Sequence, residues 1–205
     1  MLNSTPYWQS PLHEQLAQFK PDVDAAITAT ELPRMAYITV RCKTDDGAIT
    51  AVLGGALPQT MGVAHTNKAV TLWLSPDEWL VIAPYAHKES LLNDLLAAID
   101  GRIAQVVDNS GGYTSLRLTG EPHMQLLRHL TPYDVESLKI GQCAATLMSK
   151  SGVTLVRTTE HGMTLVCRRS FADYIWRLIQ KAARPYGLAL GQVSNDDFHT
   201  QWSAS

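Results

Sequence analysis

Residues 70–83, VTLWLSPDEWLVIA, predict two β-strands joined by a tight turn. Apolar and β-branched side chains fill both arms, as in strands that pack against a core. The turn at Ser75-Pro76-Asp77 has suitable chemistry, because proline presets φ and the Ser and Asp side chains bond back to the backbone. A helix that ends at Gly101 is expected to follow, with an apolar face made of Leu91, Leu92, Leu95, Leu96 and Ile99.

The same order of elements recurs roughly 80 residues later along the chain. Residues 153–167, VTLVRTTEHGMTLVC, again predict two strands around a turn, and a helix with a Ser170 N-cap and Asp173 as its capping partner should follow. Each half has the order strand, helix, strand, strand, helix. We therefore predict an α+β fold of two pseudo-repeated units, over residues 31–104 and 105–188.

The segments that flank this body are predicted to be an N-terminal arm (residues 1–30) and a polar C-terminal tail (residues 189–205). In the arm, Leu12, Leu16 and Phe19 have the spacing of a short amphipathic helix between prolines. Each flanking segment holds a tryptophan, Trp8 or Trp202. A tryptophan there can anchor the segment on its own domain or on a partner, and the sequence leaves this choice open.

Composition excludes several classes of protein. The formal net charge is −2 and charged residues make up 18%, so no basic field for nucleic acid or anionic membranes is expected. We expect no signal peptide and no membrane span, because the chain lacks both patterns. The three cysteines, Cys42, Cys143 and Cys167, are far apart and odd in number, which argues against disulfides and a zinc knuckle. Free thiols suit a cytoplasmic protein.

The residue patterns of catalytic sites are missing from the sequence. Seven histidines are scattered and no pair has the spacing of a zinc-binding H-E-x-x-H helix. The sequence contains no phosphate-binding glycine loop and no Gly-x-Ser-x-Gly element. Asp77 and Glu78 are neighbours beside a turn, so their side chains should point apart. We therefore predict no catalytic, cofactor-binding or metal-binding residue in this chain.

Two further segments are candidates for contact with other subunits, besides the arm with Trp8. Asp108 and Tyr113 bound the stretch DNSGGY, which is typical of a tight turn or of a loop at a contact. Arg168 and Arg169 follow a predicted strand, where their guanidinium groups could bind an anion or a carboxylate of a partner. Two solvated arginines at a strand end are an equally good interpretation.

Two longer motifs resemble segments of sarcosine oxidase gamma subunits. Residues 74–80, LSPDEWL, resemble an L-x-P-D-E-W-L segment of that family, and residues 168–176, RRSFADYIW, resemble its R-R-S-F-A-D-Y-x-W segment. Shorter similarities between them, at residues 118–120, 126–127, 134–135 and 141–144, keep the same order. The resemblance covers about residues 30 to 188, and two linked long segments make chance an unsatisfactory explanation.

The resemblance implies a fold similar to the folate-dependent aminomethyltransferases and a place in a heterotetrameric enzyme. That enzyme oxidises sarcosine to glycine and hydrogen peroxide, and the one-carbon unit passes to tetrahydrofolate or leaves as formaldehyde. The implied partners are the alpha, beta and delta subunits, which carry FAD, FMN, NAD and zinc. The gamma subunit of the family holds no cofactor, so the resemblance implies a structural role.

One departure from the aminomethyltransferase pattern agrees with this role. Those enzymes place an acidic pair after a glycine at a strand start, whereas this chain has Ser151-Gly152-Val153-Thr154-Leu155. Without a carboxylate, this position cannot stabilise a cationic folate nitrogen. Two alternatives stay open at this point: a stand-alone folate-binding, aminomethyltransferase-like protein, and a gamma subunit of another N-methyl amino acid oxidase.

Overall fold

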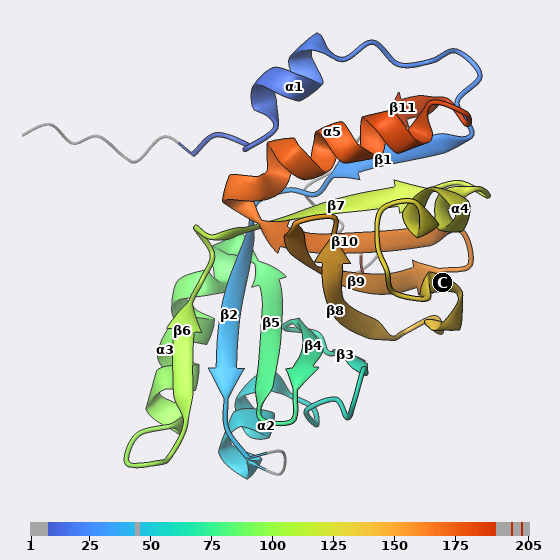
Figure 1. The fold of residues 1–205 in the computed structure, drawn as a ribbon. Helices are drawn as coiled ribbons and strands as arrows, with labels where there is room; N and C mark the ends of the chain where they lie inside the picture. Colours follow the sequence, from blue (N-terminus) through green and yellow to red (C-terminus); the bar gives the residue numbers. More distant parts are fainter. Residues whose placement is uncertain (1–7, 44–45, 192–197, 199–201, 203–205) are drawn as a thin grey trace, which may run out of the picture.

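The computed structural model describes residues 8–43, 46–191, Phe198 and Trp202. It contains two β-sheets, each with helices on one face (Figure 1). The five-stranded sheet has the order β3-β4-β5-β2-β6, and the six-stranded sheet has the order β11-β1-β7-β10-β9-β8. Among the described residues, no helix is long and apolar enough to cross a bilayer.

The five-stranded sheet is formed by one continuous stretch of chain. Its central hairpin, β4 and β5, turns at the predicted Ser-Pro-Asp segment, where Ser75 pairs with Glu78. Helices α2 and α3 pack beside each other on one face of the sheet. The elements are β2 (Met35–Arg41), α2 (Gly47–Leu53), β3 (Val63–His65), β4 (Val70–Ser75), β5 (Glu78–Pro84), the 3-10 helix η1 (Tyr85–His87), α3 (Lys88–Ala98) and β6 (Gln105–Asp108).

The six-stranded sheet repeats this arrangement. Its central hairpin is formed by β9 and β10, and α4 and α5 cover one face (Figure 1). The elements are α1 (His13–Gln18), β1 (Ile27–Glu31), β7 (Tyr113–Thr119), α4 (His123–Arg128), the 3-10 helix η2 (Val135–Ser137), β8 (Cys143–Met148), β9 (Ser151–Thr159), β10 (Gly162–Arg168), the 3-10 helix η3 (Arg169–Phe171), α5 (Ala172–Ala183) and β11 (Leu188–Leu190).

The two sheets confirm the predicted pseudo-repeat, with one insertion. The order β3-β4-β5-β2-β6 corresponds to β8-β9-β10-β7-β11, except that β1 lies between β7 and β11. β1 is antiparallel to β7 and parallel to β11. The predicted division between an arm ending at residue 30 and a body starting at residue 31 therefore falls inside β1. Residues 1–7 of that arm lie outside the described residues.

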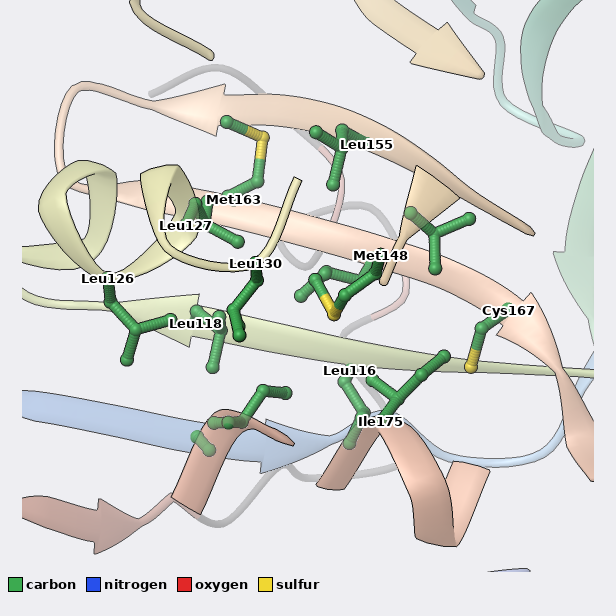
Figure 2. Close-up of a cluster of buried hydrophobic side chains, with 14 of the residues drawn as sticks. Leu116, Leu118, Leu126, Leu127, Leu130, Met148, Leu155, Met163, Cys167 and Ile175 are labelled. Carbon is green, nitrogen blue, oxygen red and sulfur yellow. The ribbon is translucent and has the colours of Figure 1, made fainter. Parts of the chain in front are cut away.

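A large hydrophobic core lies between the six-stranded sheet and its helices. Leu116 and Leu118 of β7 point toward Leu126 and Leu127 of α4, and Ile175 of α5 closes the cluster (Figure 2). The alternation of side chains along each strand sends every second residue to this face. Leu12 of the arm is fully buried here, and Phe19 makes an edge contact with Trp176 at a ring-centroid distance of 5.3 Å. The arm is thus packed on its own domain.

A second core lies where the two sheets meet, and it includes two residues of the predicted polar tail at residues 189–205. Phe198 and Trp202 are buried there, against residues of both sheets such as Leu72 and Val166. The sequence left open whether Trp202 docks on its own domain or on a partner, and its burial places it on its own domain. β11 also extends into the predicted tail, to Leu190. Residues 192–197, 199–201 and 203–205 lie outside the described residues.

Candidate functional site

Three arginines and three aromatic rings gather where the two sheets and the arm meet. We call this set the arginine–aromatic surface; it consists of Trp8, Arg34, Tyr85, Tyr113, Arg168 and Arg169. The Arg34 guanidinium lies 3.6 Å from the Tyr85 ring centroid and 5.6 Å from that of Trp8. The Arg169 guanidinium lies 5.5 Å from the Trp8 centroid. Trp8 is therefore held between two cations, a geometry that is favourable for aromatic faces.

The second arginine of the predicted pair, Arg168, points in a different direction from Arg169. The Arg168 guanidinium lies 4.4 Å from the Tyr113 ring centroid, and the two residues are direct partners across β7 and β10. Adjacent residues at a strand end point in opposite directions, so Arg168 and Arg169 serve different parts of the surface. The Arg169 N–H donates to the Gly112 carbonyl at 2.8 Å, which ties the end of β10 to the loop before Tyr113.

The loop of residues 109–112 links the two halves and is fixed by hydrogen bonds. The Asn109 amide donates to the Thr39 hydroxyl at 2.8 Å, and the Ser110 hydroxyl accepts from the Tyr37 N–H at 3.0 Å. A further turn bond joins the Gly112 N–H to the Asn109 carbonyl at 2.8 Å. These bonds place Tyr113 at the start of β7. The loop is thus both the predicted tight turn and the connection that positions Tyr113.

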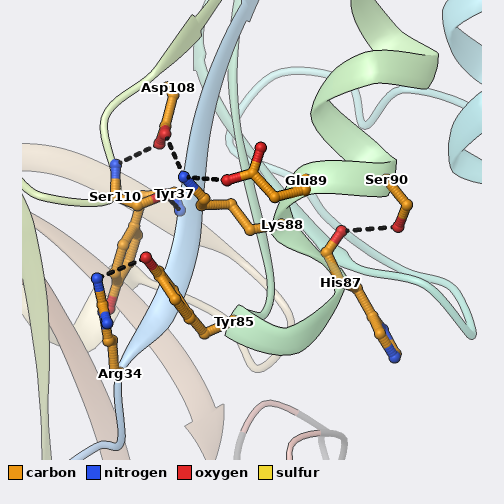
Figure 3. A network of polar contacts seen from close by, with 9 residues as sticks. All are labelled: Arg34, Tyr37, Tyr85, His87, Lys88, Glu89, Ser90, Asp108 and Ser110. Carbon is orange, nitrogen blue, oxygen red and sulfur yellow. Dashed lines mark hydrogen bonds and ion pairs between the residues drawn. The ribbon is translucent and has the colours of Figure 1, made fainter. Parts of the chain in front are cut away.

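Asp108 is exposed, but its carboxylate is held by contacts within the chain. Its carboxylate lies 3.0 Å from the Lys88 ammonium and accepts from the Ser110 N–H at 2.8 Å, while Glu89 contacts the same lysine at 2.8 Å (Figure 3). Burial would raise the pKa of Asp108, but the bonds from Ser110 and Lys88 outweigh it and lower the pKa. The bond to Glu89 and then the bond to Asp108 raise the pKa of Lys88. This structure therefore assigns Asp108 a positioning role beside the surface.

The surface carries more positive than negative charge. In the described part of the chain, Arg34, Arg168 and Arg169 form no ion pair, whereas Arg41, Arg102, Arg128 and Arg177 each do. The nearest carboxylate is Glu31, which accepts a hydrogen bond from Ser10, and burial raises its pKa despite that bond and the charge of Arg169. One carboxylate beside three guanidinium groups leaves the surface with a net positive charge.

Two open hollows flank this set of residues. One, of about 460 Å³, is lined by Pro11, Gly111, Gly112, Arg168, Arg169 and Ser170. The other, of about 430 Å³, lies between Trp8, Arg34 and Tyr85 and is completed by Pro33, Met35, Pro84, Ala86 and Phe198. Arg34 donates one N–H to the Tyr85 hydroxyl and Arg169 donates one to the Gln9 carbonyl, and the remaining in-plane N–H donors of these stacked groups suit carboxylates. The arrangement suits the binding of an acidic partner.

The structure brings four of the five predicted contact residues into one surface: Trp8, Tyr113, Arg168 and Arg169. Sequence reasoning missed Arg34 and Tyr85. The two residues come together through the pairing of β2 with β5, in which Met35 lies opposite Pro84 and so brings the preceding Arg34 toward the following Tyr85. That register depends on which strands pair, and a single sequence does not specify it.

Groups suited to covalent chemistry are poorly placed. All three cysteines are buried, and burial raises the pKa of Cys42 to about 11 and those of Cys143 and Cys167 to about 12. Thiols with such pKa values are poor nucleophiles near neutral pH. Within the described ranges, no cluster of three potential metal ligands occurs. That this chain binds no cofactor of its own stays a prediction.

Sequence relatives are found over most of the chain. A family model described as the sarcosine oxidase gamma subunit family matches residues 42–184. Sarcosine oxidase subunit gamma of Arthrobacter sp is 30% identical over 182 residues, which cover 85% of this chain and 89% of the relative. The subunit of the same name from Corynebacterium sp. strain P-1 is 32% identical over 184 residues, with the same coverage.

Solved structures share the fold. A chain of the heterotetrameric sarcosine oxidase from Corynebacterium sp. U-96, solved in complex with pyrrole 2-carboxylate, superposes with a TM-score of 0.79 and 25% identity over 91% of this chain and 99% of that one. Aminomethyltransferase T of the glycine cleavage system from Bartonella henselae has a TM-score of 0.65 and 13% identity, covering 88% of this chain and 58% of that one. The second likeness concerns the fold alone and confirms the predicted fold class.

Proposed function

This chain belongs to the sarcosine oxidase gamma subunit family, and from that premise we propose that it is the non-catalytic structural subunit of a heterotetrameric sarcosine oxidase. The partners in this proposal are the alpha, beta and delta subunits, which hold the FAD, FMN, NAD and zinc. The complex oxidises sarcosine to glycine and hydrogen peroxide, and the one-carbon unit passes to tetrahydrofolate or leaves as formaldehyde.

The observation that carries the proposal is the arginine–aromatic surface. Its three arginines are held by rings and lack ion pairs within the described residues, so their charge is available to another molecule. Arginine and tryptophan are also the residues that most often dominate the energy of protein interfaces. A structural subunit needs such a surface, whereas an enzyme needs reactive groups that converge in a pocket.

The contact residues of the proposal are Trp8, Tyr113, Arg168 and Arg169, joined by Arg34. Trp8 is 38% exposed, which leaves a substantial part of its ring for contact with a partner. Asp108 acts indirectly, because its bonds to Lys88 and Ser110 fix the loop that precedes Tyr113. The alternative of a stand-alone folate-binding protein rests on a likeness of fold alone.

The test is the purification of the tagged chain from its native host, with an absorbance spectrum and identification of the retained proteins. A yellow complex that contains flavin, three further subunits and sarcosine-oxidising activity is the expected result. A colourless protein that purifies alone would overturn the proposal. Titration of that protein with tetrahydrofolate would then test the folate-binding alternative.

A further inference from the structure

One face of the six-stranded sheet is only partly covered by the first half of the chain. The face turned away from α4 and α5 carries Tyr113 and Ser115 on β7, Val166 and Arg168 on β10, Gly152 and Thr154 on β9, and Ala145 and Leu147 on β8. Val166 is buried in the core between the sheets, whereas Gly152 and Ala145 are exposed and Leu147 is 51% exposed. One end of this face is therefore open to solvent.

The open end forms a shallow hollow of about 200 Å³, which we call the sheet-face hollow. It is lined by Tyr113, Ala145, Thr146, Gly152, Val153, Thr154, Val166 and Arg168. The floor is made of small residues, and a Cβ atom placed on Gly152 would have no neighbour within 4 Å. Pockets that enclose a whole small-molecule ligand usually measure about 300–1,000 Å³. The sheet-face hollow is smaller, and its size suits one inserted side chain.

The charge of this face is positive. None of the residues that the strand register places on it is acidic, and Arg168 forms no ion pair among the described residues. The Tyr113 ring supports one side of the Arg168 guanidinium at 4.4 Å, which orients the group and leaves its edge donors for a carboxylate. The half-exposed Leu147 borders the same face and provides apolar contact.

We infer that the sheet face around Arg168 and Gly152 receives an acidic segment of a partner subunit. One carboxylate of this segment pairs with the Arg168 guanidinium, and a neighbouring side chain fills the sheet-face hollow. The inference rests on the proposed function and adds to it the chemistry of the partner and the position of the contact. It extends the arginine–aromatic surface beyond the residues around Trp8.

Gly152→Leu is the sharpest test, because it changes shape without changing charge. The backbone of Gly152 has no positive φ and the new side chain meets no neighbour, so the chain should fold at least as well as before. Filling the hollow should lower the amount of partner subunits retained on the tagged chain by about tenfold or more. Gly47→Leu is the matched control, since Gly47 is equally exposed and equally free of neighbours.

Arg168→Glu tests the charge in the same assay. It should reduce retention of the partners by about tenfold or more, and Arg168→Lys should give an intermediate loss because it keeps the charge but not the forked donors. Arg128→Glu is the control, because Arg128 is exposed and lies on α4. Retention of the partners by wild type and by Arg168→Lys should fall as salt is added, because salt screens the ion pair in both.

The outcomes separate the two proposals. If the wild type retains flavin and partner subunits, and Gly152→Leu and Arg168→Glu retain them equally well, this inference is overturned. The proposed function then stands. A wild-type chain that purifies alone would overturn both. A wild-type dimer that Gly152→Leu dissociates would also overturn the inference, because the occupant of the hollow would then be a second copy.

Discussion

His123 has a buried ring at the first position of α4. Its Nδ1 lies 2.8 Å from the Gly120 carbonyl oxygen, and within the described residues its Nε2 has no hydrogen-bond partner. Burial lowers the pKa of His123 below its ordinary value of 6.5, and the nearby charges of Arg157 and His161 act in the same direction. The folded protein therefore holds this ring in its neutral form.

This ring should make the protein less stable in mild acid. As the pH falls through 6.5, His123 of the unfolded chain takes up a proton that the folded chain resists, so the free energy of unfolding decreases. His123→Asn keeps a donor to Gly120 and removes the titration, and its stability should change less between pH 7 and pH 5. Urea unfolding at several pH values measures this. His129→Asn, at an exposed position, is the control, and an unchanged pH slope in His123→Asn would contradict the assignment.

Gly120 is a position where the backbone requires glycine. Its φ is +125°, and a Cβ atom would lie 2.0 Å from the Ala26 carbonyl oxygen. Gly120→Ala should lower the free energy of unfolding by more than about 2 kcal/mol, because strain and a backbone clash combine. Gly141→Ala has a similar left-handed φ of +79° but no neighbour within 4 Å, so it should cost only about 1–2 kcal/mol. Equal losses of stability in Gly120→Ala and Gly141→Ala would show that a clash with Ala26 does not contribute.

At the scale of single elements, the hairpins were predictable from the sequence. The predicted strands at 70–74 and 78–83 match β4 and β5 to within a residue, because side-chain alternation and the turn residues are local signals. Five further strands were not predicted: β1, β3, β6, β8 and β11. β1 and β11 are short, and each depends on a neighbour distant in sequence, such as the pairing of Ile27 with Leu188.

The predicted cap of α5 at Ser170 was wrong. The helix begins at Ala172 after the 3-10 turn η3, and no side chain caps it. Asp173 instead pairs with Arg177 one turn later, at 2.9 Å. The cause is the entry of the chain through a 3-10 turn, which shifts the N-cap position from Ser170 to Phe171 and the helix start by one residue. The candidate site was predictable only in part. Individual residues were identified from the sequence, but which of them lie together depends on strand register.

The arm containing α1 offers a test at this scale. Phe19 connects the arm to α5 through its edge contact with Trp176. Phe19→Ala should release this part of the arm and accelerate cleavage by a glutamate-specific protease after the exposed Glu14 of α1, with a loss of stability of about 1–3 kcal/mol. Limited proteolysis followed by mass spectrometry measures the rate. Phe171→Ala removes an exposed ring and should leave cleavage unchanged; equal rates in wild type and Phe19→Ala would rule out this anchoring role.

At the scale of the whole molecule, the core between the sheets holds the two halves together. Trp202 is 1% exposed within it, among residues of both sheets. Trp202→Ala should cost about 3–5 kcal/mol, a large share of the stability of an ordinary domain. Trp8→Ala, at an exposed position, should have a much smaller effect on Tm. Similar Tm values for the two variants would mean that Trp202 does not join the halves.

The position of β1 also has a consequence for how the protein is made. All strands of the five-stranded sheet lie between residues 35 and 108, so this sheet can form while synthesis is still in progress. β1 is synthesised first, yet its two neighbours, β7 and β11, leave the ribosome much later. Until then, β1 has no neighbouring strand to pair with, and its backbone donors and acceptors stay open to other chains. The six-stranded sheet can close only after β11 has emerged, and the contact surface built on its strands matures last.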